Sequence, residues 1–266
     1  TEEEKKIGRD YLNSIGMKAN EKFVCLNVRD TRYKEKYFPD HDWSYHNYRN
    51  SDIETYVKAC NFLANNGYWV FRMGKEVLKP LKSENRRVID YASSEKRNDF
   101  LDIWLIANSE FVISTSSGID AVKNLYRKPA LILNILPIGD LSLCYHNIIY
   151  PKNLKKKNEV NYLNCEEYMK HNYYNYHEYL KNDIQVIDLT ENEILEAVKE
   201  TLKRLKNEWK ESDKEKYLQK EFIKKYLNWK KENMNKSNLY LNKNFNIHPG
   251  FKISLRFLEN NSRWIL

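Results

Sequence analysis

Short apolar runs alternate with amphipathic stretches through the first half of the chain. The runs have the length and the β-branched and aromatic content of buried strands. They lie at residues 22–28, 68–72, 87–91, 110–114 and 130–134. Apolar residues recur at helical spacing over residues 52–65, 99–108 and 119–127. Strands that alternate with helices predict right-handed crossovers and a parallel sheet covered on both faces. We therefore expect an α/β chain with a Rossmann-like, doubly wound parallel sheet.

The second half of the chain has a looser pattern. A strand is expected at 184–189, and Thr190 with Glu193 forms a capping-box pattern ahead of the next helix. The charged, amphipathic stretch at 212–234 predicts a further helix. We therefore expect three segments, which are an approach helix between domains at 1–21, a Rossmann-like domain at 22–210 and a C-terminal helical extension at 211–266.

Composition allows a folded chain with some attraction for anions. The 266 residues are 41% hydrophobic and have a formal net charge of +8. This hydrophobic content can build the core of one large or two small domains. Basic and acidic residues are mixed along the sequence and form no basic block. The charge therefore favours anionic ligands or a membrane surface, and we expect no nucleic acid partner.

The four cysteines, Cys25, Cys60, Cys144 and Cys165, lie far apart and form no CxxC pair. This spacing is typical of buried, reduced thiols in a cytoplasmic protein and argues against zinc. No apolar run approaches the roughly 20 residues that span a bilayer. We expect a cytoplasmic location, with peripheral contact to the inner membrane surface as the closest approach to a lipid.

One strand passes abruptly into small polar residues and then into a helix, in EFVISTSSGIDAV at residues 110–122. Small side chains let the backbone approach an anion, and a helix N-terminus suits a phosphate. A plain N-cap formed by Ser117 or Thr115 is the alternative. The corner that we expect to bind phosphate consists of Ser114, Thr115, Ser116, Ser117 and Gly118.

Basic residues follow two other predicted strands at the same edge of the sheet. Arg29 comes after the first strand, and Arg72 and Lys75 end or follow the second. Each residue alone fits a surface or salt-bridge role. Together with the serine corner, two guanidinium groups and a lysine predict a site for a diphosphate.

The segment at 29–52 is long for a connection between a strand and a helix, where 2–6 residues are usual. It contains Asp30, Asp42 and His46 among several aromatic residues. Such a loop can bind sugars or supply a catalytic base. An ordered aromatic loop that packs on the domain is the alternative.

Several of these stretches, in the same order, resemble a family of bacterial glycosyltransferases from surface-polysaccharide gene clusters. The stretches are RDTRYKEKYFPDHDWSYHNYRNSDI, GYWVFRMGK, DYASSEKRNDFLDIWLIAN, FVISTSSGIDAV and YRKPALILN. The resemblance covers residues 22–137, and GFKISLRFLENNSRWIL at 250–266 is similar to the end of the family's chains.

The resemblance implies a GT-B fold, in which two Rossmann-like domains face each other across a cleft. The C-terminal domain of that fold holds the nucleotide-sugar donor, so residues 22–210 would be the donor-binding domain. Most of the N-terminal domain would be missing from this chain. A more distant similarity is to GT-B fucosyltransferases, where an arginine at the position of Arg29 holds the donor phosphate. The paired arginines typical of those enzymes are not found here.

The resemblance also implies a hexosyl- or deoxyhexosyltransferase that acts on a glycan or a lipid-linked acceptor. The diphosphate gains charge as it leaves, and preorganised donors stabilise it without a metal or cofactor. Asp120 would bind ribose hydroxyls and Tyr91 would stack on the base. The candidates for the catalytic base are Asp30, Asp42 and His46. The residues expected to hold the diphosphate are Arg29, Arg72, Lys75 and the corner Ser114–Gly118.

Two other functions fit the same features. A nucleotide-sugar epimerase of this architecture would bind the same donor but would need no acceptor. A non-catalytic domain that binds a glycan or a partner enzyme would fit the aromatic loop.

Overall fold

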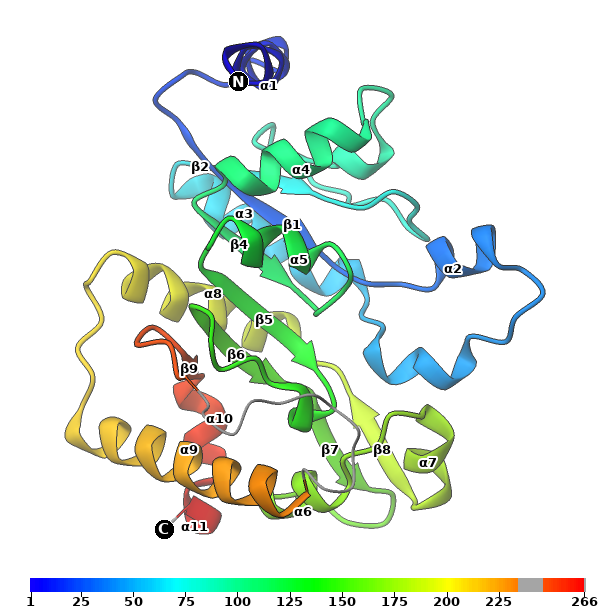
Figure 1. The fold of residues 1–266 in the computed structure, drawn as a ribbon, viewed down its shortest axis with the longest axis vertical. Coiled ribbons are helices and arrows are strands. Elements are labelled where there is room, and N and C mark those ends of the chain that lie inside the picture. The colour runs from blue at the N-terminus through cyan, green and yellow to red at the C-terminus, as the bar shows by residue number, and fades with distance from the viewer. Residues whose placement is uncertain (234–245, 266) are drawn as a thin grey trace.

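The fold is known from a computed structural model that describes residues 1–233 and 246–265. Its centre is a seven-stranded sheet in the order β3-β2-β1-β4-β5-β6-β9, and every pairing in it is parallel (Figure 1). The strands are β1 (Lys22–Asn27), β2 (Tyr68–Arg72), β3 (Val88–Ile89), β4 (Phe111–Ser114), β5 (Ala130–Ile135), β6 (Asn147–Pro151) and β9 (Lys252–Ile253). The first six strands have the Rossmann order 3-2-1-4-5-6, so the predicted doubly wound fold is confirmed.

Helices cover both faces of the sheet. On one face α3 packs on β2 and α8 packs on β5, and the two helices contact each other. On the other face α4 contacts α5, and α1 lies outside α4 (Figure 1). These helices are α1 (Glu2–Ser14), α3 (Val57–Asn65), α4 (Asp99–Asn108), α5 (Asp120–Leu125) and α8 (Glu191–Leu205).

The remaining elements lie in connections and in the C-terminal part. A separate sheet pairs β7 (Asn153–Lys156) with β8 (Ile184–Ile187) in antiparallel fashion. The strand expected at 184–189 therefore does not extend the main sheet. The other helices are α2 (Arg32–Tyr37), α6 (Cys165–Lys170), α7 (Tyr176–Lys181), α9 (Asp213–Asn233), α10 (Leu255–Asn260) and α11 (Ser262–Ile265), with 3-10 turns η1 (Ser44–Arg49), η2 (Ile53–Tyr56), η3 (Tyr91–Ser93) and η4 (Ile138–Asp140).

Several predicted elements are shorter in the structure. The helix expected at 52–65 begins with the 3-10 turn η2 and is an α-helix only from Val57, and the strand expected at 184–189 ends at Ile187. The helix expected at 119–127 is α5, which ends at Leu125, and Arg127 has a φ of 52°, outside the helical range. The strand expected at 87–91 keeps only two paired residues, because Tyr91 already belongs to η3. In contrast, β2 and α4 begin and end at the predicted residues.

The C-terminal segment adds a strand as well as helices. Gln219 of α9 donates from Nε2 to the carbonyl of Ile253 at 2.7 Å, and the Ile253 amide donates back to Oε1 at 3.1 Å. These bonds attach α9 to β9, the last strand of the sheet. Residues 234–245 and 266 of the predicted extension lie outside the described residues.

The N-terminal helix packs directly on the domain. A Cβ added to Gly8 would lie 2.0 Å from the ring of Trp104, so only glycine lets α1 approach α4 this closely. Tyr11 is buried beside Tyr91, with the two rings edge to face.

Cys25, Cys60 and Cys165 are buried free thiols. Cys144 is exposed, so the expectation that it is buried is wrong. Among the described residues, no helix combines the length and the apolar character needed to cross a bilayer.

Candidate functional site

A pocket of about 460 Å³ lies at the carboxyl ends of β1 and β4. The sheet order reverses between these strands, with β2 and β3 on one side and β5 and β6 on the other. Ligands of doubly wound proteins bind at such a reversal. We call this cavity the switch-point pocket. Its lining comes from the ends of β1, β2 and β4 and from α2 and α4, and consists of Asn27, Val28, Arg29, Asp30, Tyr33, Lys34, Gly74, Lys75, Glu76, Val77, Asp102, Ser117, Gly118 and Ile119.

The carboxylate of Asp120 accepts hydrogen bonds from the serine corner, Ser114–Gly118, and so occupies some of its donors. Ser114 Oγ donates to Asp120 Oδ1 at 2.7 Å, and the Ser117 amide donates to Asp120 Oδ2 at 3.3 Å. Burial raises the pKa of Asp120, while Lys123 opposes the shift. The expected contact of Asp120 with ribose does not fit these bonds, because the carboxylate faces into the corner. The alternative, a plain N-cap from Ser117 or Thr115, does not fit either, because the N-cap residue of α5 is Ile119 and no side chain caps it.

Ser114 and Thr115 are buried, and Thr115 Oγ1 accepts a hydrogen bond from the Arg29 amide at 2.9 Å. Ser116 has a φ of 60°, which is strained for a residue with a Cβ. These residues shape the turn from within. The residues of this turn that line the pocket are Ser117, Gly118 and Ile119. Within the described residues, the amides of Gly118 and Ile119 donate no hydrogen bond, so they are available to a ligand.

Gly118→Val is expected to abolish nucleotide binding and leave the fold intact. A Cβ at Gly118 meets no atom within 4 Å, so valine costs the fold little and fills space at the pocket. Circular dichroism would report the fold and calorimetric titration the binding of nucleoside diphosphates. Gly118→Ala should give a smaller loss. A folded Gly118→Val protein with normal affinity would show that the corner only shapes the turn.

Arg29 and Lys34 line the pocket, and Arg49 lies next to it, bonded to the Ser116 carbonyl. Within residues 1–233 and 246–265, none of these three cations forms an ion pair with a carboxylate. Arg29 Nη1 donates to Asn50 Oδ1 at 2.7 Å, and Arg49 Nη2 donates to the Ser116 carbonyl at 2.8 Å. Burial, followed by the charge of Arg49, lowers the pKa of Arg29 to about 10. An anion bound here would relieve this repulsion.

The sequence analysis did not identify Lys34 or Arg49 as candidates for binding an anion. Lys34 Nζ lies 3.8 Å from the centre of the Trp43 ring, and burial followed by Arg29 and Arg49 lowers its pKa. Both residues belong to the long segment at 29–52. The unusual length of that segment was the available signal, but the sequence did not show which of its basic residues turn inward.

Lys75 lines the pocket as predicted. Its Nζ lies 3.5 Å from Asp99 Oδ1, and both side chains are largely exposed. Such a surface pair contributes little stability, so Lys75 is free to turn toward an anion.

Arg72 lies beneath the pocket and not in it. Its side chain has no exposed surface and forms ion pairs with Asp90 at 3.3 Å and Asp30 at 3.8 Å. The expected contact with a diphosphate does not fit this burial. Its ion pair with Asp30 indicates a positioning role, although Arg72 Nη2 forms no hydrogen bond in the described structure. The two oxygens of Asp30 accept from the amides of Arg32 and Leu78 at 2.9 Å each.

Tyr91 is not placed to stack on a base. Its side chain is buried, and its hydroxyl donates to the Asn98 carbonyl and accepts from the Asn98 amide, each at 3.1 Å. The ring packs against Tyr11. The expected role of Tyr91 does not fit, because η3 turns the ring into the core.

The three candidate bases are separated. Asp30 lines the switch-point pocket, while Asp42 is exposed and lines none of the described pockets. Hydrogen bonds from the Ser44 amide and hydroxyl lower the pKa of Asp42, which makes it a weaker base. The His46 carbonyl accepts a hydrogen bond from Arg29 Nη1 at 3.2 Å. The Nδ1 atom of His46 is buried and has no hydrogen-bond partner among the described residues.

Burial, with Lys34, Arg29 and Arg49 as further causes, lowers the pKa of His46 to about 4. The ordinary value is about 6.5, so the fold favours neutral His46. Neutral His46 therefore contributes to the free energy of unfolding above pH 6.5, and this contribution is lost as the pH falls from 6.5 toward 4.

Urea unfolding across that window should show a steeper decrease in the free energy of unfolding for the wild type than for His46→Gln. The exposed His41→Gln control should follow the wild type, and equal slopes for wild type and His46→Gln would contradict the prediction.

The chain matches no protein-family model and no curated protein. The resemblance to bacterial glycosyltransferases therefore stays a prediction.

Proposed function

We propose that the chain binds a nucleoside diphosphate sugar in the switch-point pocket and transfers its glycosyl group to a glycan or a lipid-linked acceptor. The observation that supports this most is that Arg29 and Lys34, which line the pocket at the reversal of strand order, and Arg49 beside it form no ion pair within the described residues. A volume of about 460 Å³ lies in the usual range for small-ligand sites.

Such a site acts mainly by stabilising the negative charge on the leaving diphosphate. The charge grows as the glycosidic bond breaks, and fixed guanidinium groups stabilise it without reorganising. Arg29 is held by Asn50 and Arg49 by the Ser116 carbonyl, so both are ordered before a ligand arrives. Lys75 and the amides of Gly118 and Ile119 supply the remaining donors.

Asp30 is the candidate base that this arrangement favours. It lines the pocket, and each of its oxygens keeps a lone pair beside the hydrogen bond that it accepts. In the proposed reaction, Asp30 takes the proton of the acceptor hydroxyl as the glycosyl group is transferred.

A panel of nucleotide sugars, each with and without glycan acceptors, tests the proposal. Glycosyl transfer requires acceptor-dependent release of the nucleoside diphosphate. Conversion of the sugar without an acceptor would indicate an epimerase, and binding without turnover on any acceptor would favour a non-catalytic domain.

A further inference from the structure

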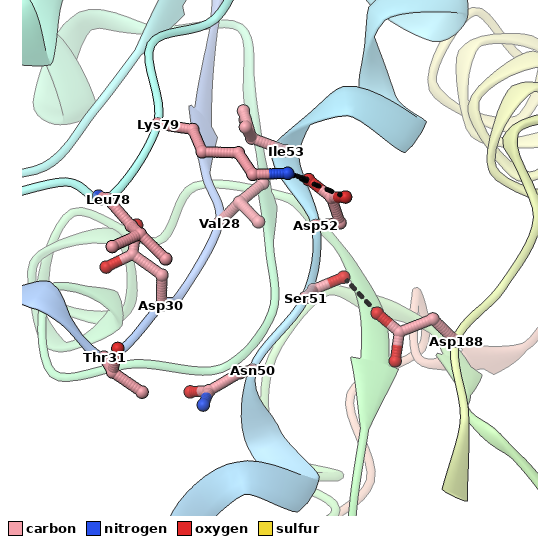
Figure 2. Close-up of a pocket in the computed structure, with 10 residues that line it drawn as sticks. All are labelled: Val28, Asp30, Thr31, Asn50, Ser51, Asp52, Ile53, Leu78, Lys79 and Asp188. Carbon is pink, nitrogen blue, oxygen red and sulfur yellow. Dashed lines mark hydrogen bonds and ion pairs between the residues drawn. The ribbon is translucent and has the colours of Figure 1, made fainter.

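A second pocket of about 300 Å³ lies beside the first and is shown in Figure 2. The two cavities share Val28 and Asp30. In Figure 2, Asp30 and Thr31 lie on one side and Asp188 on the other, with Asn50 and Ser51 between them. We call this cavity the polar pocket. Its lining consists of Val28, Asp30, Thr31, Asn50, Ser51, Asp52, Ile53, Leu78, Lys79 and Asp188.

The charges of the polar pocket are already paired. Lys79 lies 3.3 Å from Asp52, the buried Lys152 lies 2.5 Å from Asp188, and Arg72 lies 3.8 Å from Asp30. The pocket therefore offers little net attraction to an ionic ligand, in contrast to the unpaired cations next to it. It still presents carboxylate, amide and hydroxyl groups that can bond to a ligand hydroxyl.

A network of buried hydrogen bonds holds the lining of this pocket in place. Asn134, fully buried with a φ of 54° in a bulge of β5, donates from Nδ2 to Ser51 Oγ at 2.8 Å. Ser51 Oγ in turn donates to Asp188 Oδ2 at 3.0 Å. Lys152 Nζ bonds both Asp188 and the Asn50 carbonyl, each at 2.5 Å. Bulges and strained residues often mark functional sites, and here they order the polar groups of a cavity.

We propose that the polar pocket binds a neutral, polyhydroxylated sugar ring, with Asp52 and Asp188 as acceptors for its hydroxyl groups. This inference rests on the proposed function, which it deepens by placing the sugar next to the diphosphate. The side chain of Asp188 is 32% exposed and that of Asp52 is 45% exposed, so both are accessible to a ligand. The ring is either the glycosyl group of the donor or an acceptor sugar, and Asp30 lies between the two cavities in both cases.

Amide shifts in nuclear magnetic resonance spectra of the full chain test this placement. The neutral probes are the methyl glycosides of glucose, galactose and fucose, and the charged comparators are glucuronate and glucosamine. We expect the neutral glycosides to shift the amides of Thr31, Ser51 and Asp52 more strongly than the comparators do. If the ring belongs to the donor, a nucleotide sugar shifts these amides and its nucleoside diphosphate alone does not. If the ring is the acceptor, free methyl glycosides still shift them when a nucleotide sugar is bound.

Variants give the second readout. Asp188→Asn and Asp52→Asn are each expected to weaken sugar binding by about tenfold, the loss of a charged hydrogen-bond acceptor. Asp188→Asn leaves Lys152 unpaired and can unfold, whereas Asp52→Asn keeps an N-cap for η2 and stays informative. Glu191→Gln on α8 is the matched control.

The inference is overturned if neutral sugars, free or nucleotide-linked, leave these amides unshifted, or if the charged comparators bind as tightly. Unchanged sugar affinity in folded Asp52→Asn also overturns it. These results remain distinct from failure of the proposed function, because nucleoside diphosphates would still shift the amides of Arg29 and Gly118.

Discussion

Arg72→Met is expected to destabilise the fold by about 3 kcal/mol, the low end of the range for removing one partner of a buried ion pair. The substitution keeps most of the side-chain volume but leaves Asp30 and Asp90 without their shared cation. The low end applies because both carboxylates keep some exposure, 17% and 15% of their side-chain surface, and because backbone amides still bond them. Urea unfolding at neutral pH measures the change.

A matched control separates this effect from the general loss of a basic residue. Lys58→Met removes an exposed partner of Glu191 and should change stability by less than about 1 kcal/mol. If Arg72→Met is as stable as Lys58→Met, Arg72 does not hold Asp30 in place, and its suggested positioning role is lost.

Arg29→Ala is expected to weaken binding of nucleoside diphosphates by about 1.5–3 kcal/mol, which corresponds to roughly 10- to 150-fold. The guanidinium is held by Asn50 and by the His46 carbonyl at the edge of the pocket, and no carboxylate in the described chain forms an ion pair with it. Its removal therefore takes away a preorganised donor to the anion. Calorimetric titration gives the affinity.

Arg86→Ala makes the same change in net charge at an exposed residue that does not line the pocket. It should bind nucleotide like the wild type, and Arg29→Lys should fall between the two because it keeps the charge but loses the fork of donors. Equal losses for Arg29→Ala and Arg86→Ala would mean that only net charge attracts the ligand.

The core of the sheet could be predicted because its strands have strong local patterns. The strands at 68–72 and 111–114 are buried at every residue, and each follows a clear helix end. Local pattern could not predict β9, which has only two residues and is held by β6 and Gln219 of α9. It also could not predict that the strand at 184–187 pairs with β7, since antiparallel pairing depends on tertiary contacts.

The position of the switch-point pocket follows from the topology, but several of the expected residue roles do not fit the structure. The carboxyl ends of parallel strands meet at one edge, and this brought Arg29, Lys75 and Gly118 to one pocket. The rule does not tell which face a terminal side chain takes, and Arg72 points into the core beside Asp30 and Asp90. Asp120 differs for another reason, since a short acidic side chain in the first turn can satisfy the corner's own donors.

The most direct test of the central claim is a crystal structure of the chain soaked with UDP, GDP, ADP and dTDP. The account predicts that at least one nucleotide binds with its phosphates in the switch-point pocket, in contact with Arg29 and the amides of Gly118 and Ile119. Phosphates bound elsewhere on the chain, or no binding by any of the four at millimolar concentration, would contradict it.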